Sequence, residues 1–169
     1  MKHLGKCKAC TMKENIATTR KDDSAYSRML KAIKASEEIK RATTGVPLDL
    51  HYNAMALLQE SDVRHLVDVI WNKQSAISST SNLYELILTR WDPMQEISPW
   101  NCVLLTKSEA VTHDKQSDPL SLYSDEFKNK ISRKHLAAKQ HFSQLPAIEK
   151  FIKRHYVEDF TGKLVVKSE

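Results

Sequence analysis

The sequence predicts a single α+β domain that is predominantly helical, with four to five helices around a two-stranded antiparallel pair. Three observations predict this fold. The chain has 169 residues, the size of one ordinary domain. Most of its apolar residues recur at helical spacing, and two apolar runs in the middle are rich in strand-favouring residues. We expect a basic arm over residues 1–22, the domain over 23–155 with a central hairpin at about 83–106, and a tail over 156–169.

The first predicted helix covers roughly residues 24–42. Asp22, Asp23 and Ser24 supply side chains that cap helix N-termini, and Thr43-Thr44-Gly45 closes the segment. Between them runs an apolar stripe at helical spacing, and Glu37 falls at the next position of that spacing. The stripe consists of Tyr26, Met29, Leu30 and Ile33.

The second helical region contains the strongest amphipathic signal in the chain. A segment around Leu50–Leu58 forms a short helix whose type the sequence leaves open. Ser61 and Asp62 then cap a longer helix, whose apolar residues occupy the i, i+3, i+4, i+7 and i+8 positions of one face. The serine-rich stretch 72–82 follows, and the helix either ends before it or extends partway into it through Ala76 and Ile77. The apolar face consists of Val63, Leu66, Val67, Ile70 and Trp71.

Two apolar runs in the middle of the chain predict an antiparallel pair of strands. They cover 83–91 and 100–106, and the polar connection between them is bounded by Asp92-Pro93 and Ser98-Pro99. Because an isolated pair is marginal in water, helices must cover one of its faces. Two short helices are the alternative interpretation.

Three further helices are expected after the hairpin. Thr106 and Glu109 have the spacing of a capping box and open a short helix that reaches His113. After a polar loop over 114–121, Ser124-Asp125-Glu126 opens a helix whose apolar side is formed by the residues Phe127, Ile131, Leu136 and Ala138. The break at 144–146 precedes a last helix marked by Ile148, Phe151 and Ile152. The tail from Val157 either docks as a strand or stays loose.

The composition excludes several classes of function. Only three glycines occur, so the chain has no Walker loop, dinucleotide-binding fingerprint or kinase-type phosphate cover. Its apolar runs are too short to cross a bilayer, and its basic start lacks the apolar core of a signal peptide. The three cysteines are an odd number, which favours a reducing compartment. We therefore expect a soluble, cytoplasmic protein without a membrane partner.

One cysteine pair raises the question of a metal. His3, Cys7 and Cys10 form an H-x3-C-x2-C cluster, and two thiolates at that spacing can bind one tetrahedral ion. A closed zinc site needs four ligands, and the others would have to come from Cys102, His113 or another distant histidine. Because there is no second half-site with matching spacing, we favour reduced cysteines and no cofactor. Structural zinc is the alternative.

Catalytic arrangements are also missing from the pattern. The seven histidines are scattered without a motif around any nucleophile. Cys102 lies in a predicted buried strand and is expected to be a core thiol. Glu37-Glu38 and Asp22-Asp23 are neighbours in sequence and do not form a facing acid–base pair. The sequence therefore predicts that the protein is not an enzyme.

The basic residues gather on two of the predicted helices. The formal net charge is +5, which favours an acidic partner surface. A solvated helix face is the ordinary alternative, and the interleaved aromatic residues of a single-stranded nucleic-acid platform are missing. We favour an acidic protein over nucleic acid as the partner. The candidate partner-binding residues are Arg28, Lys31, Lys34, Lys128, Arg133 and Lys134.

Large aromatic residues are expected to anchor the domain. Each tryptophan lies on an apolar segment, so each is expected in the core, and one that proved exposed would become a candidate interface residue. The predicted structural anchors are Trp71, Trp91, Trp100 and Phe142.

Three parts of the chain carry a family resemblance. They are residues 2–10, residues 83–92 together with 98–107, and residues 134–139 together with 141–146. The last two parts include the strings Ser-Pro-Trp-Asn-Cys and Phe-Ser-Gln-Leu-Pro. Together these segments resemble the C-terminal region of the IQ motif and ubiquitin-like domain-containing family, components of ciliary and flagellar radial spokes. The likeness spans most of the chain, from about Lys2 to Ile152.

The resemblance implies a structural role in the axoneme, the microtubule core of the cilium or flagellum. The expected place is the base or stalk of a radial spoke, where the partners would be spoke subunits or the acidic surface of the doublet microtubule. The chain has no Ile-Gln pair, so calmodulin binding is not carried over, and it has too few residues ahead of residue 24 for a ubiquitin-like domain, so ubiquitin-like contacts are not carried over. The alternative is a zinc-stabilised nucleic-acid-binding or regulatory module that uses Cys7 and Cys10.

Overall fold

The computed structural model describes residues 24–44, 54–162 and 164–167. Within them the α+β, predominantly helical class is confirmed, with five α-helices and a central antiparallel strand pair. The helices are α2 (Ser24–Thr44), α3 (Glu60–His65), α4 (Lys107–Lys115), α5 (Asp125–Phe142) and α6 (Pro146–His155), and the short helical segments are η2 (Ala54–Leu57), η3 (Leu66–Ile70) and η4 (Pro119–Leu122). The predicted arm, with His3, Cys7 and Cys10, lies outside the described residues.

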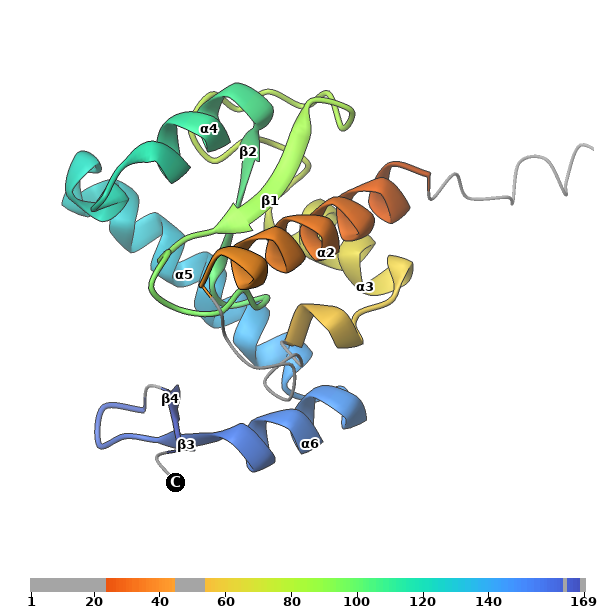
Figure 1. The fold of residues 1–169 in the computed structure, drawn as a ribbon, viewed down its shortest axis with the longest axis vertical. Coiled ribbons are helices and arrows are strands. Elements are labelled where there is room, and N and C mark those ends of the chain that lie inside the picture. The colour runs from red at the N-terminus through yellow and green to blue at the C-terminus, as the bar shows by residue number, and fades with distance from the viewer. Residues whose placement is uncertain (1–23, 45–53, 163, 168–169) are drawn as a thin grey trace, which may run out of the picture.

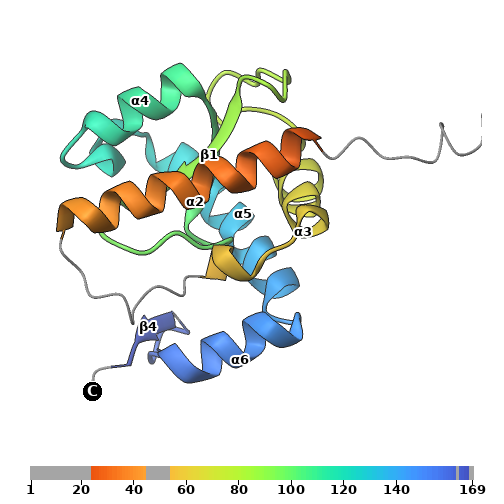
Figure 2. The same ribbon diagram turned by 45° about the vertical axis from the view of Figure 1, so that its right-hand side comes forward.

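The central pair consists of β1 (Leu86–Arg90) and β2 (Cys102–Thr106), which run antiparallel with Leu88 opposite Leu104. The predicted hairpin is therefore correct, and the alternative of two short helices is wrong. Four consecutive residues of β2, 102–105, are buried, so both faces of this strand are covered. In both ribbon views α2 passes in front of the pair and α5 lies behind it (Figures 1 and 2).

Helix α2 buries the stripe that its sequence predicts. Tyr26, Met29, Leu30 and Ile33 are all core residues, and the helix packs on α3 and β1. Glu37 continues the buried stripe even though it carries a carboxylate, so a partner for its charge is needed inside the fold.

The helix predicted after Ser61 and Asp62 is confirmed, but it changes from an α-helix to a π-helix along its length. Its apolar face from Val63 to Trp71 is buried, as expected. The α-helical turn of α3 widens into the π-helical segment η3, and the helix ends at Trp71 because Asn72 and Lys73 both adopt a positive φ of 55°. The chain beyond is not helical, yet Ala76 is buried and its backbone N–H donates to the Leu104 carbonyl oxygen at 2.9 Å.

The capping signals of the next two helices are confirmed. Thr106 Oγ1 accepts a hydrogen bond from the Glu109 backbone N–H at 3.3 Å, and the Glu109 carboxylate accepts one from the Thr106 N–H at 2.9 Å. Helix α4 then continues to Lys115. Ser124 Oγ accepts from the Phe127 N–H at 3.2 Å and starts α5.

One residue of the predicted apolar side of α5, Leu136, does not face the core. Ile131, Ala138 and Phe142 are buried, whereas the Leu136 side chain is 57% exposed. Five residues separate Leu136 from Ile131, which turns it roughly 140° around a helix of 3.6 residues per turn. Leu136 therefore faces away from the core stripe.

The end of the described chain forms a small sheet of its own. Strand β3 (Tyr156–Glu158) follows α6 directly and pairs antiparallel with β4 (Leu164–Val166), through a turn in which Gly162 has a φ of +78°. Of the two possibilities for the tail, strand formation is correct, but the strands do not join the central pair. Both views place this hairpin beside α6, away from β1 (Figures 1 and 2). Among the described helices, none combines the length and apolar character needed to cross a bilayer.

Candidate protein-interaction surfaces

The predicted cations of α2 divide into exposed and inward-facing groups. Lys31 and Lys34 are exposed. Arg28 instead turns toward the chain ahead of β1, where its guanidinium donates to the Leu83 carbonyl oxygen at 2.7 Å and to the Tyr84 carbonyl oxygen at 2.9 Å. Its guanidinium carbon also lies 5.4 Å from the centre of the Tyr84 ring. The structure thus gives Arg28 a role in holding this loop.

One predicted cation of α5, Arg133, lines a hollow at the start of that helix. It shares a cavity of about 710 Å³ with Lys130, Glu126, Phe127 and two polar neighbours. Lys128 is half-buried, with its ammonium 3.9 Å from the Asp125 carboxylate. Burial, followed by the nearby charge of Lys130, lowers the pKa of Lys134. In the hollow itself, the two cations Lys130 and Arg133 outnumber the one carboxylate, that of Glu126.

The two groups of cations do not form one patch. Helix α2 lies in front of the central strands and α5 behind them in both ribbon views (Figures 1 and 2). The structure brings Lys128, Lys130 and Arg133 together on one helix, and it holds Lys31 and Lys34 on another. The domain can therefore present positive charge to neighbours on two sides.

The four predicted anchors occupy different depths. Trp71 and Phe142 lie in the core. Trp91 is half-buried in an aromatic cluster, with its ring centre 5.3 Å from that of Tyr123 and 5.8 Å from that of His113. Trp100 is also half-buried, and it lines a surface groove. Of the three tryptophans, Trp100 is the one that a partner in this groove could contact.

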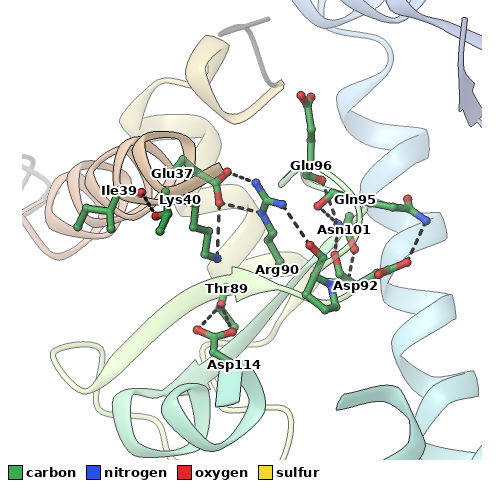
Figure 3. A network of polar contacts seen from close by, with 12 residues as sticks. Glu37, Ile39, Lys40, Thr89, Arg90, Asp92, Gln95, Glu96, Asn101 and Asp114 are labelled. Carbon is green, nitrogen blue, oxygen red and sulfur yellow. Dashed lines mark hydrogen bonds and ion pairs between the residues drawn. The ribbon is translucent and has the colours of Figure 1, made fainter. Parts of the chain in front are cut away.

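A buried ion pair fastens α2 to the end of β1 (Figure 3). The Arg90 guanidinium donates from Nε to one carboxylate oxygen of Glu37 at 3.0 Å and from Nη2 to the other. Its remaining Nη1 donates to the Pro93 carbonyl oxygen at 3.3 Å, and Lys40 lies 3.8 Å from the same carboxylate. The charge of Glu37 is thereby matched inside the fold.

Asn101 organises the loop that follows this ion pair (Figure 3). Its side-chain oxygen accepts a hydrogen bond from the Asp92 backbone N–H at 2.9 Å. Its Nδ2 donates to the Asp92 carbonyl oxygen at 3.2 Å, to that of Gln95 at 3.4 Å and to that of Glu96 at 2.9 Å. One buried side chain therefore holds both ends and the middle of the loop.

The loop forms one wall of a groove of about 670 Å³. Helix α5 forms a second wall, and the β3–β4 hairpin forms the third. The exposed apolar side chains here include Met94, which is 89% exposed, and Leu136. The groove is lined by Met94, Gln95, Glu96, Ser98, Trp100, Asn101, His135, Leu136, Lys139, Tyr156, Asp159 and Val165.

The basic groups of the groove are already engaged within the fold. His135 Nε2–H donates to the Cys102 carbonyl oxygen at 2.7 Å, and burial lowers the pKa of this imidazole. The Lys139 ammonium donates to the Gly162 carbonyl oxygen at 3.1 Å and lies 3.6 Å from the Glu158 carboxylate. Lys139 therefore ties the hairpin to α5.

Glu96 is in a different position at the same groove. Its side chain points away from the Arg90–Glu37 pair (Figure 3), and among the described residues its carboxylate makes no hydrogen bond or ion pair. Partial burial raises the pKa of Glu96, and Glu37 adds to that shift, whereas the charges of Arg90, Arg41 and His155 oppose it. The groove thus carries a carboxylate that no described residue binds directly.

Cys102 and His113, the described candidates for further zinc ligands, are both buried. The described residues contain no group of three or more histidines, cysteines or carboxylates that could hold a metal ion. Burial raises the pKa of Cys102 to about 12, which keeps its thiol protonated at neutral pH. His113 is buried, with Nδ1 accepting from the Tyr123 hydroxyl at 2.7 Å and Nε2 donating to the carbonyl oxygens of Arg90 and Trp91. The two described residues considered as further zinc ligands are thus both engaged in the fold.

Sequence reasoning missed most of the groove. Leu136 could have been recognised, because it falls outside the spacing that connects Ile131, Ala138 and Phe142. Asn101 gives no comparable signal, since its role depends on the folded path of the loop. Tyr156 and Val165 reach the groove only because the tail folds back as a hairpin.

Comparison with known proteins finds a relative that matches nearly the whole chain. No family model matches the sequence. The chain is 35% identical over 164 residues to the mouse IQ motif and ubiquitin-like domain-containing protein, which covers 96% of this chain and 20% of that protein. The resemblance predicted from the sequence is therefore confirmed, and the chain spans about a fifth of this relative's length.

A second match is short. The yeast tRNA threonylcarbamoyladenosine dehydratase 2 is 43% identical over 53 residues, which is 31% of this chain and 11% of that protein. The match to the mouse protein, in contrast, bears on the whole domain. Two of the segments that carry the predicted resemblance, 98–107 and 134–139, contribute residues to the groove.

Proposed function

We propose that this chain is a non-enzymatic assembly module that acts through protein–protein contacts in the ciliary or flagellar axoneme, in a radial spoke near its attachment to the doublet microtubule. One observation carries the proposal: the 35% identity to the IQ motif and ubiquitin-like domain-containing protein extends over 96% of the chain. A match of that extent covers the core as well as the exposed surfaces. The place in the spoke follows from what the resemblance implies.

The charge of the molecule supports contacts with acidic neighbours. The chain carries a net charge of +5, and the exposed lysines of α2 and the cavity at the start of α5 lie on different sides. Charges at the rim of an interface mainly guide association and orient the partners. An acidic spoke subunit or microtubule surface on either side is the partner that this distribution suits.

The proposal includes neither calmodulin binding nor the zinc-stabilised nucleic-acid module. Calmodulin is left out because the chain has no Ile-Gln pair. The zinc-stabilised nucleic-acid module is left out because no observation on the described residues favours it. Metal analysis of the purified chain distinguishes the two hypotheses, because stoichiometric zinc would support the zinc-stabilised module.

A charge-reversal experiment tests the proposal. The variant Lys31→Glu/Lys34→Glu changes two exposed cations of α2, and Lys150→Glu/Arg154→Glu makes the same change in net charge on exposed α6 residues. Tagged chains are expressed in ciliated cells, and detergent-washed axonemes are extracted with increasing salt. We expect wild type and the α6 variant to stay with the axoneme to the same salt concentration, and the α2 variant to leave at lower salt.

Two results would count against the proposal. A wild-type chain that leaves with the detergent-soluble fraction would contradict the axonemal place. Equal release of the two double variants would contradict the role of the α2 lysines. Circular dichroism of each variant verifies that the fold is retained.

A further inference from the structure

We propose that the groove between the 92–101 loop, α5 and the β3–β4 hairpin binds a basic amphipathic helix of a neighbouring protein. Its apolar side chains would rest on Trp100 and Leu136, and a lysine or arginine at its edge would pair with Glu96. This inference goes beyond the proposed function, because it concerns a different face and holds wherever the chain resides.

The groove has the apolar surface that such a helix needs. Met94 and Leu136 are largely exposed, and Trp100 is half-buried with part of its surface in the groove. The hairpin adds Val165, and Phe160, next to the groove residue Asp159, is fully exposed. Apolar side chains gathered around one hollow are typical of a surface that a partner covers.

The groove wall is held in place before any partner arrives. Asn101 fixes the loop through backbone contacts with Asp92, Gln95 and Glu96. Lys139 fixes the hairpin to α5 through the Gly162 carbonyl oxygen. A preformed wall lowers the ordering cost of binding. Because Asn101 already binds the carbonyl oxygens of Asp92, Gln95 and Glu96, the groove suits packing of a helix better than addition of a strand.

The charges of the groove select a basic partner. The Glu96 carboxylate makes no hydrogen bond or ion pair among the described residues (Figure 3), although the charges of Arg90, Arg41 and His155 act on it. The ammonium of Lys139 is already matched by Glu158. The groove thus offers a partner one carboxylate without a direct contact, on a chain whose net charge is +5. A partner with positive flanks complements this groove, although it is repelled by the rest of the molecule.

Two synthetic peptides provide the test with the full chain. Both are helices of about 18 residues, or five turns, with leucines along one face. One carries lysines beside the leucines and the other carries glutamates. Binding is measured by fluorescence anisotropy, and contact with the groove by the NMR signal of the Trp100 indole. We expect the lysine peptide to bind at least about tenfold more tightly than the glutamate peptide, against the preference that the net charge would impose.

Variants of the chain identify the groove as the binding place. Leu136→Asp is expected to weaken binding of the lysine peptide at least about tenfold, because it places a charge on the apolar contact. Leu122→Asp is the matched control, since Leu122 is 54% exposed on η4 and does not line the groove. Glu96→Gln is expected to retain apolar binding and to lose the preference for lysine.

Three results would overturn the inference. The first is equal or tighter binding of the glutamate peptide to the wild-type chain. The second is equal weakening by Leu136→Asp and Leu122→Asp. The third is self-association of the chain that Leu136→Asp abolishes in sedimentation experiments, because the occupant of the groove would then be a second copy.

Discussion

At the scale of single residues, Glu37 and Arg90 show how one polar pair can connect two elements. The Glu37 side chain is 5% exposed and that of Arg90 is 18% exposed, so neither charge is well solvated. Removing one partner leaves the other buried and unmatched, which is more costly than removing both.

We therefore expect Arg90→Met to lower the free energy of unfolding by about 3 kcal/mol. The double variant Glu37→Met/Arg90→Met should recover most of that loss, because no buried charge remains. Urea denaturation of the wild type, the two single variants and the double variant measures the coupling. Additive losses in the double variant would show that the two side chains act independently.

Cys102 gives a second prediction at this scale. Burial raises the pKa of its thiol to about 12, and thiol reagents attack the thiolate. In the variant Cys7→Ser/Cys10→Ser, which retains this cysteine alone, we expect no modification by iodoacetamide at pH 7.5 until denaturant is added. Rapid alkylation of the native variant, detected by mass spectrometry, would show that the thiol is accessible and that the β2 environment is described wrongly.

The sequence predicted the burial of Glu37 but not the roles of Arg90 and Asn101. Glu37 was expected on the buried stripe of the first helix because it follows Ile33 at i+4. Its partner Arg90 was not foreseen, because the pair joins segments 53 positions apart and no local rule connects them. Asn101 was missed for the same reason, since its contacts exist only once the loop has closed.

At the scale of elements, a pair of histidines joins α3 to α5. The rings of His65 and His141 stack with centres 3.7 Å apart and an angle of 12° between their planes. Burial, followed by the charge of His141, lowers the pKa of His65 below its ordinary value of 6.5, with Asp62 opposing the shift.

This packing makes the stability depend on pH. A histidine whose pKa is lowered in the folded state binds fewer protons there than in the unfolded chain. Its contribution is therefore fully present above pH 6.5 and is lost as the pH falls through the lowered folded value. We expect the free energy of unfolding to decrease from pH 7 to pH 5, and His65→Phe, which keeps a ring on His141, to reduce that slope.

Urea titrations at several pH values measure both curves. The buried His135 also has a lowered pKa, so some slope should remain in the variant. If the free energy of unfolding has the same pH dependence in the wild type and in His65→Phe, the stacked pair does not cause that dependence.

Most elements followed from periodicity and capping. The helices at Tyr26–Ile33 and after Ser124, the hairpin and the Thr106 capping box all depend on local patterns, and all are confirmed. The π-helical widening of η3 and its end at Trp71 were not predicted, because the polar stretch after it is compatible with a helix until the positive φ values of Asn72 and Lys73 are known.

At the scale of the whole molecule, the protein is a small domain with two cationic surfaces and one apolar groove. The cations of α2 and of the α5 cavity suit acidic neighbours, whereas the groove beside the β3–β4 hairpin exposes apolar side chains and the Glu96 carboxylate. A subunit of this kind can contact several different partners at once. The sequence predicted the basic surfaces from composition, but the groove depends on three distant segments meeting and could not be read from any one of them.

The most direct test of the central claim is cross-linking mass spectrometry of intact axonemes that contain this chain. The exposed lysines Lys31 and Lys34 provide reactive amines on α2, and Lys130 provides one at the α5 cavity. The account predicts that these lysines cross-link to radial spoke subunits or to tubulin at the base of a spoke. Cross-links confined to proteins outside the spokes, or recovery of the chain only from the soluble fraction, would contradict it.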